Sequence, residues 1–145
     1  MNAYDDSNIF ARILRGEIPS TKVYEDADTL AFMDVMPQSP GHLLVVPKAA
    51  SRNLLDADPA VLARILPIVQ RVARAAKEAF GADGVTVIQY NEAAAGQTVF
   101  HLHFHVIPAF DGARRGGHAK VQAPTETLVA NAAKLKAAMD EAEKE

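Results

Sequence analysis

The segment at residues 100–108 alternates histidine with apolar residues, and it constrains the fold of this chain more than any other feature. Its sequence, Phe-His-Leu-His-Phe-His-Val-Ile-Pro, places His101, His103 and His105 at every second position. That period belongs to a β-strand, whose successive side chains point to opposite faces. We therefore predict a strand over residues 99–108 with its three imidazole rings on one face. Because imidazole titrates near neutrality, the row can supply a nucleophile, a proton carrier or a metal ligand.

Composition limits the classes of protein to which the chain can belong. Its 145 residues suffice for one domain with its own core, with 49% hydrophobic and 23% charged residues. The net charge of -3 gives no basic face, so we expect no nucleic acid and no membrane as partner. The absence of cysteine excludes disulfides, thiolate zinc sites and cysteine nucleophiles. The polar, acidic N-terminal residues predict an untargeted, cytoplasmic protein.

Periodicity and turn residues divide the chain into helices and strands. Apolar spacing predicts helices over residues 9–14, 59–80 and 125–145, with Ser7 and Asp58 as the first two N-caps. Strands are expected at residues 21–24, 30–33, 42–46, 85–89 and 99–108. The Gly- and Arg-rich residues 111–124 predict a flexible connector, in which His118 is expected to be a solvated loop residue.

A loop of small and polar residues precedes the histidine segment. In residues 91–98, Gly96 lets the backbone approach a ligand, and Asn91, Gln97 and Thr98 can donate hydrogen bonds to phosphoryl oxygens. An ordinary loop-to-strand junction would explain the same residues. Three histidines directly after the loop favour the phosphate interpretation.

Two further side chains are candidates for a binding site. Asp34 follows an apolar strand and precedes Pro37, where its carboxylate could hold the diol of a ribose, although the spacing alone favours a turn cap. His42 opens the predicted strand at residues 42–46. A lone histidine in that position is usually structural.

Five motifs occur together in one order between residues 7 and 108. They are Ile-Phe-x-x-Ile, Phe-x-Asp-x-x-Pro, Pro-Gly-His-Leu-Leu-Val-Val-Pro-Lys, Gly-Gln-Thr-Val and His-x-His-x-His-Val-Ile. This set resembles the histidine triad (HIT) family. The resemblance implies an α+β, HIT-like fold with a five-stranded antiparallel sheet, one long and one short helix, and a C-terminal helix beyond the match. It also implies a catalytic domain over residues 1–113, followed by a connector and helix over 114–145, and a homodimer whose subunits join edge to edge.

The resemblance further implies a hydrolase acting on a purine nucleotide-type small molecule. The family attacks the α-phosphorus of nucleoside phosphoramidates or dinucleoside polyphosphates, forms a nucleotidyl-histidine intermediate and releases a nucleoside monophosphate. The nucleophile would be His103. Because neutral imidazole attacks phosphorus well by itself, we expect no cofactor and no metal.

The remaining site residues also follow from the resemblance, position by position. His101, His105 and His42 would orient the nucleophile, contact the phosphate and shuttle protons. Asp34 would bind the ribose. The phosphate side would comprise Asn91, Gly96, Gln97 and Thr98, and the apolar wall around the base Ile9, Phe10, Ile13, Phe32 and Val35.

The sequence departs from the family pattern at two places. Many bacterial members bind zinc through two cysteines and a further histidine together with the first triad histidine, but here Asn8, Ala11 and Ala50 occupy the matching positions. We therefore expect no structural zinc, since one histidine alone cannot hold it. Glu92 also stands where a glycine is expected, directly after Asn91.

Two alternatives to the hydrolase remain open on the sequence. One is a nucleotide- or partner-binding module with little catalysis, which could use the acidic C-terminal helix for docking. The other is a catalytic zinc site formed by three histidines at positions i, i+2 and i+4 of one strand.

Overall fold

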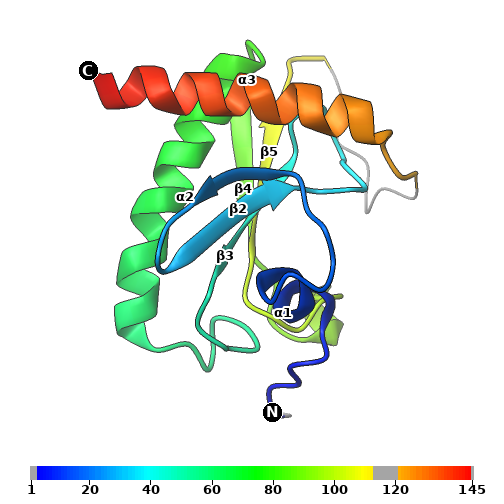
Figure 1. The fold of residues 1–145 in the computed structure, drawn as a ribbon, viewed down its shortest axis with the longest axis vertical. Coiled ribbons are helices and arrows are strands. Elements are labelled where there is room, and N and C mark those ends of the chain that lie inside the picture. Colours follow the sequence, from blue (N-terminus) through cyan, green and yellow to red (C-terminus); the bar gives the residue numbers. More distant parts are fainter. Residues whose placement is uncertain (1–2, 113–120, 145) are drawn as a thin grey trace.

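A five-stranded antiparallel sheet forms the centre of the computed structural model, which describes residues 3–112 and 121–144 (Figure 1). The strand order is β1-β2-β3-β5-β4. The strands are β1 (Lys22–Glu25), β2 (Thr29–Met33), β3 (Leu43–Pro47), β4 (Gly84–Ile88) and β5 (Phe104–Ala109). The predicted α+β class and five-stranded sheet are confirmed. Most of the predicted connector, including His118 and the division after residue 113, lies outside the described residues.

The described residues also form three α-helices: α1 (Ile9–Leu14), α2 (Pro59–Ala79) and α3 (Thr125–Lys144). The α2 helix begins as predicted, because the Asp58 carboxylate accepts a hydrogen bond from Ala60 N at 2.8 Å. The prediction of Ser7 as the cap of α1 is wrong. Asn8 caps α1 by accepting from Ala11 N, whereas the Ser7 hydroxyl donates to the Asp5 carboxylate. Among the described helices, none is long and apolar enough to cross a membrane.

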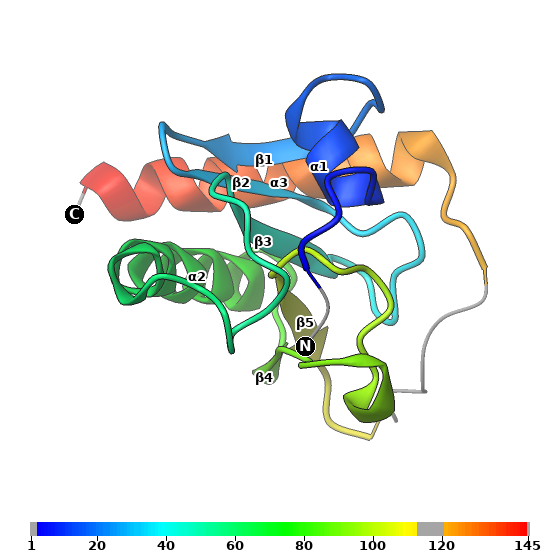
Figure 2. The ribbon, with the colours of Figure 1, turned by 90° about the horizontal axis from the view of Figure 1, so that it is seen from below.

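The two faces of the sheet support separate apolar clusters because side chains alternate along each strand. On one face, residues such as Ala31, Leu43 and Val106 pack beneath α2 and α3 in the main core. On the opposite face, Phe32 and Leu44 pack with α1 in a smaller cluster. Figures 1 and 2 show α1 on the opposite side of the sheet from α2. The smaller cluster lies on the face toward which the side chain of His105 points, since His105 pairs with Leu44 across the strands.

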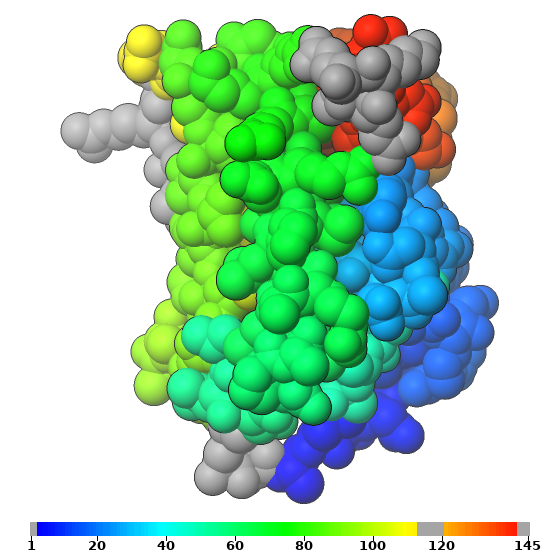
Figure 3. All heavy atoms as spheres, turned by 90° about the vertical axis from the view of Figure 1, so that its left-hand side faces the viewer, coloured from blue at the N-terminus to red at the C-terminus, as the bar shows by residue number. Residues whose placement is uncertain are grey.

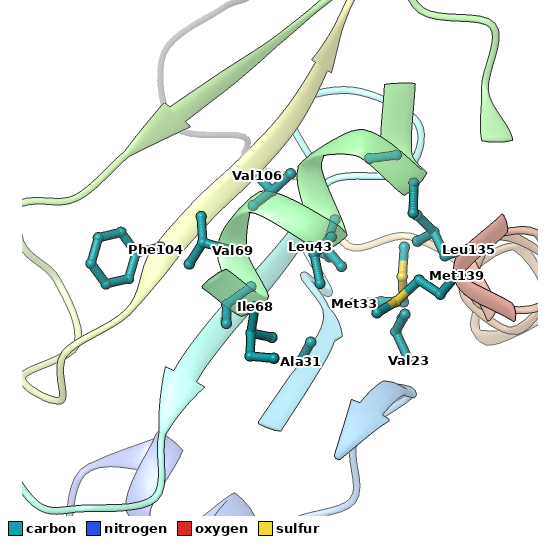
Figure 4. Close-up of a cluster of buried hydrophobic side chains, with 14 of the residues drawn as sticks. Val23, Ala31, Met33, Leu43, Ile68, Val69, Phe104, Val106, Leu135 and Met139 are labelled. Atoms are coloured by element: carbon teal, nitrogen blue, oxygen red, sulfur yellow. The ribbon is translucent and has the colours of Figure 1, made fainter. Parts of the chain in front are cut away.

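The C-terminal helix is integrated into the main core. Leu135 is fully buried in α3, and Met139 from the next turn packs in the same cluster as Met33 and Val23 (Figure 4). Figure 3 shows α2 covering the middle of this side of the molecule, with the β1–β2 hairpin in blue beside it and part of α3 in red above. The apolar face of α3 is therefore occupied by the core and is not available for docking a partner.

The histidine segment is strand only in its second half, so the predicted strand over residues 99–108 is too long at its start. β5 begins at Phe104, after His101 and His103. Before that point the backbone is held by a different segment: Leu102 N donates to Ser51 O at 2.9 Å. The side chains nevertheless keep the two-residue alternation, because Leu102 and Phe104 pack in the main core whereas the His103 ring contacts Phe10 of the smaller cluster. His101 and His103 take different hydrogen-bond partners.

Candidate active site

His103 has a defined neutral form in the centre of the site. Its ring is 5% exposed, and its Nδ1 lies 2.7 Å from the backbone oxygen of His101. A carbonyl oxygen only accepts hydrogen bonds, so Nδ1 carries the proton and the lone pair is on Nε2. Burial lowers the pKa of His103 to about 4, which keeps the ring neutral at pH 7. The result is an imidazole with the protonation state that a nucleophile needs.

His101 is fixed by the protein at both ring nitrogens. Nε2 lies 2.8 Å from the carbonyl oxygen of Pro47, and Nδ1 lies 2.7 Å from the hydroxyl of Tyr4. Nε2 therefore donates, and Nδ1 accepts the tyrosine proton. Burial lowers the pKa of this histidine as well. Because both ring nitrogens form hydrogen bonds, the position of His101 is fixed, and its backbone carbonyl in turn accepts from Nδ1 of His103.

His42 and His105 form a pair next to His103. The backbone N–H of Gln38 donates to Nδ1 of His42 at 3.0 Å, so the His42 proton is on Nε2. That nitrogen lies 3.0 Å from Nδ1 of His105 and 3.3 Å from Oδ2 of Asp34. The rings of His105 and His103 meet edge to face at 5.0 Å between centroids. Residues directly after β2, directly before β3 and within β5 thus form one polar group, in which His42 is buried and Asp34 is partly exposed.

Asp34 has a turn-capping role in this structure, in addition to its proximity to His42. Its Oδ1 accepts a hydrogen bond from Met36 N at 2.8 Å, which is the cap expected from spacing alone. Its Oδ2 faces the His42 ring. The ribose contact implied by the family resemblance remains a prediction.

The amide side chains of the loop at residues 91–98 bind the protein itself. Gln97 is buried, its Nε2 donates to the backbone oxygens of Arg52 and Val99, and its Oε1 accepts from Asn53 and from Glu92 N. Asn91 Oδ1 accepts from Leu54 N at 2.9 Å. These two side chains therefore set the shape of the loop.

Gly96 and Thr98 complete the same loop. At Gly96 the φ angle is 110°, and a Cβ atom would lie 3.2 Å from the Tyr90 ring, so only glycine fits without a shift. The exposed Thr98 lines a cavity of about 310 Å³ together with Ile9. Thr98 thus borders a cavity, whereas the amide side chains of Asn91 and Gln97 bind protein atoms.

The predicted apolar wall divides into buried and exposed members. Phe10 and Phe32 are buried, pack edge to face at 5.4 Å, and Phe10 also contacts the His103 ring at 4.9 Å. Ile13 packs against the same cluster. Ile9 and Val35 are 46% and 48% exposed, as expected for side chains that could cover a planar ligand. A second cavity, of about 280 Å³ between residues 37–41 and α3, contains none of the predicted site residues.

The arrangement of donor atoms bears on the metal hypotheses. Among the described residues, Asp34, His42 and His105 form a group whose ligand atoms all lie within 4.8 Å of one another. This group includes only one of the three alternating histidines. The geometry does not support the three-histidine zinc site, because the two ring nitrogens of His101 are directed to Tyr4 and Pro47.

Several residues that hold the site are not evident in the sequence motifs. Tyr4 lies 97 positions from the histidine that it contacts, and Arg52 and Asn53 lie in an unremarkable loop before α2. Their contribution depends on contacts between distant segments, for which periodicity carries no signal.

The sequence was also compared with models of protein families. The model of the HIT domain matches residues 15–112. The chain belongs to the HIT domain family. α3 lies beyond the matched residues, although it forms part of the core.

Relatives of known structure and named activity extend this comparison. A crystal structure of a HIT-like protein involved in cell-cycle regulation from Bartonella henselae is 56% identical, has a TM-score of 0.90, and covers 94% of this chain and 99% of its own. A zinc-bound histidine triad family protein from Mycobacterium smegmatis is 33% identical with a TM-score of 0.84, over 95% of this chain and 96% of its own. Adenosine 5'-monophosphoramidase hnt1 of Schizosaccharomyces pombe is 41% identical over 102 residues, or 70% of this chain and 74% of that protein.

Proposed function

We propose that this HIT protein is a nucleotide hydrolase or transferase that uses His103 as its nucleophile. Its substrates would be nucleoside phosphoramidates or dinucleoside polyphosphates, attacked at the α-phosphorus. The observation that carries the proposal is the state of His103, whose proton is held on Nδ1 by the His101 carbonyl while Nε2 keeps its lone pair. The named activity of the phosphoramidase relative supports the same substrate class.

The reaction would proceed in two steps through a covalent intermediate. Nε2 of His103 attacks phosphorus as the bond from phosphorus to the leaving group breaks, which gives a nucleotidyl-imidazolium. An amine leaves with a proton taken up from solvent through the neighbouring histidines, and a nucleotide leaves as its anion. The Nδ1–H bond to the His101 carbonyl favours this cation, because it strengthens as the ring becomes positive. Water then attacks the same phosphorus and gives up a proton to solvent, the P–N bond to His103 breaks, and the nucleoside monophosphate and neutral His103 are released.

The surrounding groups would support binding and proton transfer. Because Nδ1 of His105 accepts from His42, the His105 proton is on Nε2, where it can donate to a phosphoryl oxygen. Thr98 and the backbone of the loop would contact the remaining oxygens, and Ile9 and Val35 would cover the base. A purine-type base, the ribose contact of Asp34 and a cytoplasmic location are parts of this proposal.

The assay is the release of AMP from adenosine 5'-phosphoramidate. We expect turnover by the wild type and none by His103→Asn, whose amide can still donate to the His101 carbonyl but cannot attack phosphorus. Rapid quenching followed by intact-mass measurement should detect a nucleotidyl adduct on the wild type only. His118→Ala, outside the predicted site, serves as the control. Turnover retained by His103→Asn would refute the role of His103 as the nucleophile. Tight AMP binding by the wild type without turnover would favour a binding module.

We also propose that the active form is a homodimer joined through the edge of the sheet. β1 and β4 are the two edge strands, and Val87 on β4 is 46% exposed. An exposed edge strand can pair with a second chain. Sedimentation of the wild type and of Val87→Pro tests this, because proline on the edge removes a backbone donor; a monomeric wild type would refute the dimer.

A further inference from the structure

Glu92 adopts a backbone conformation that is unfavourable for its side chain. Its φ and ψ angles are 75° and 158°, and among the described residues it is the one non-glycine residue with positive φ. This region is populated almost entirely by glycine, because a Cβ atom clashes there with the neighbouring backbone. Something in the surrounding structure therefore holds Glu92 in place of the glycine that the sequence pattern leads us to expect.

The Glu92 carboxylate is held by a network from the segment before α2. Arg52 donates to it twice, from Nε at 2.9 Å and from Nη2 at 3.0 Å, and Asn53 Nδ2 donates at 2.6 Å. The Arg52 guanidinium also lies 4.1 Å from the centroid of the Phe100 ring. The side chain of Arg52 is 10% exposed and that of Glu92 is 34% exposed, so water reaches this two-point ion pair from the glutamate side only.

The backbone of Glu92 organises the loop itself. Its N–H donates to Gln97 Oε1 at 2.8 Å, and its carbonyl accepts from Ala95 N and Gln97 N. Gln97 in turn donates to the Arg52 carbonyl at 2.7 Å. Glu92 near the start of the loop at residues 91–98 and Gln97 near its end therefore both form hydrogen bonds with residues 52 and 53.

The segment at residues 51–53 also contacts the backbone next to His103, the proposed nucleophile. The carbonyl oxygen of Ser51, the residue directly before Arg52, accepts a hydrogen bond from the N–H of Leu102, which lies between His101 and His103. We propose that the Arg52–Glu92 ion pair is a positioning device, which holds the loop at residues 91–98 in the conformation that binds the phosphoryl group. The strained backbone of Glu92 is retained because its carboxylate makes this attachment. The inference rests on the proposed function for the chemistry but can be tested separately by binding.

Glu92→Gly separates backbone strain from positioning. Glycine suits the φ angle, so the variant should fold with a melting temperature close to that of the wild type. We expect AMP binding, measured by calorimetry, to weaken about tenfold, and the nucleotidyl adduct on His103 to form about tenfold more slowly in single turnover, as for the loss of about 1.4 kcal/mol of interaction. Glu92→Gln keeps the backbone strain and loses the charge, so it should show a smaller decrease in AMP affinity and in the rate of adduct formation. Glu17→Gln removes the exposed ion pair with Arg15 and should change neither.

A double-mutant cycle identifies the partner of Glu92. Arg52→Gln should cause a loss similar to that of Glu92→Gln, and the double variant should be no worse than either single one. If the wild type turns over and Glu92→Gly equals it in AMP affinity and adduct rate, the positioning inference is overturned. If the wild type binds AMP without turnover and Glu92→Gly weakens that binding, the proposed hydrolysis fails and the positioning role stands. If the wild type does neither, both fail.

Discussion

Replacement of Tyr4 by phenylalanine tests how His101 supports the site. The Tyr4 hydroxyl lies 2.7 Å from Nδ1 of His101, a side chain that is 1% exposed. The change removes one oxygen atom and leaves the tyrosine ring, which packs edge to face on the imidazole at 5.7 Å. Any effect can therefore be assigned to the hydrogen bond.

The cost follows from the environment of Nδ1. The proton of His101 is on Nε2, where it is bonded to Pro47 O, so Nδ1 can only accept and would be left without a donor. A buried acceptor that loses its partner costs about 1–3 kcal/mol. We expect the free energy of unfolding to fall by that amount. Movement of the His101 backbone would also misplace His103, so AMP release should slow about five- to tenfold, equivalent to about 1–1.4 kcal/mol.

Urea denaturation and AMP release are measured on the same preparations. Tyr24→Phe is the matched control, because the Tyr24 hydroxyl also donates one hydrogen bond, to Asp26 at 2.7 Å, but in β1 away from the site. The control should lose stability and keep its activity. Wild-type stability and activity in Tyr4→Phe would refute the reasoning, and a loss of stability without any loss of activity would show that His101 does not transmit its position to His103.

Three further outcomes are expected. Burial lowers the pKa of His103 from 6.5 to about 4, so between these pH values the unfolded chain binds more protons than the folded one. Lowering the pH from 6.5 to 4 should therefore reduce the free energy of unfolding by about 3 kcal/mol through this residue. Urea titrations of His103→Asn at the two pH values should lack that decrease. Leu135→Ala should reduce the free energy of unfolding by about 2–5 kcal/mol, whereas Val129→Ala on the exposed face of α3 should have little effect; equal stabilities would contradict the integration of α3 into the core. Dialysis against EDTA should leave activity unchanged, and stoichiometric zinc lost together with activity would refute the metal-free mechanism.

The site was predictable from sequence where chemistry and local pattern coincide. The motif set places His42, His103 and His105 together, and the structure brings their rings into contact across β3 and β5. Alternation in the second half of the histidine segment correctly indicates a strand. Asp58 followed by Pro59 correctly indicates the start of α2. These features depend on neighbours within a few residues, which a sequence displays directly.

The sequence by itself indicated five strands, the last of them too long at its start, as well as the long helix and the residue types that the proposed site requires. Only the tertiary structure decided which nitrogen of each histidine carries the proton, because this depends on the group that each ring nitrogen meets. The partner is the nearby His101 carbonyl for His103, and the distant Pro47 carbonyl and Tyr4 hydroxyl for His101. It also decided that Gln97 binds protein atoms, and that Glu92 adopts a conformation typical of glycine while its carboxylate accepts from Arg52. Amide and carboxylate side chains accept many partners, so their residue types fix what they can bind. Packing of remote segments fixes what they do bind.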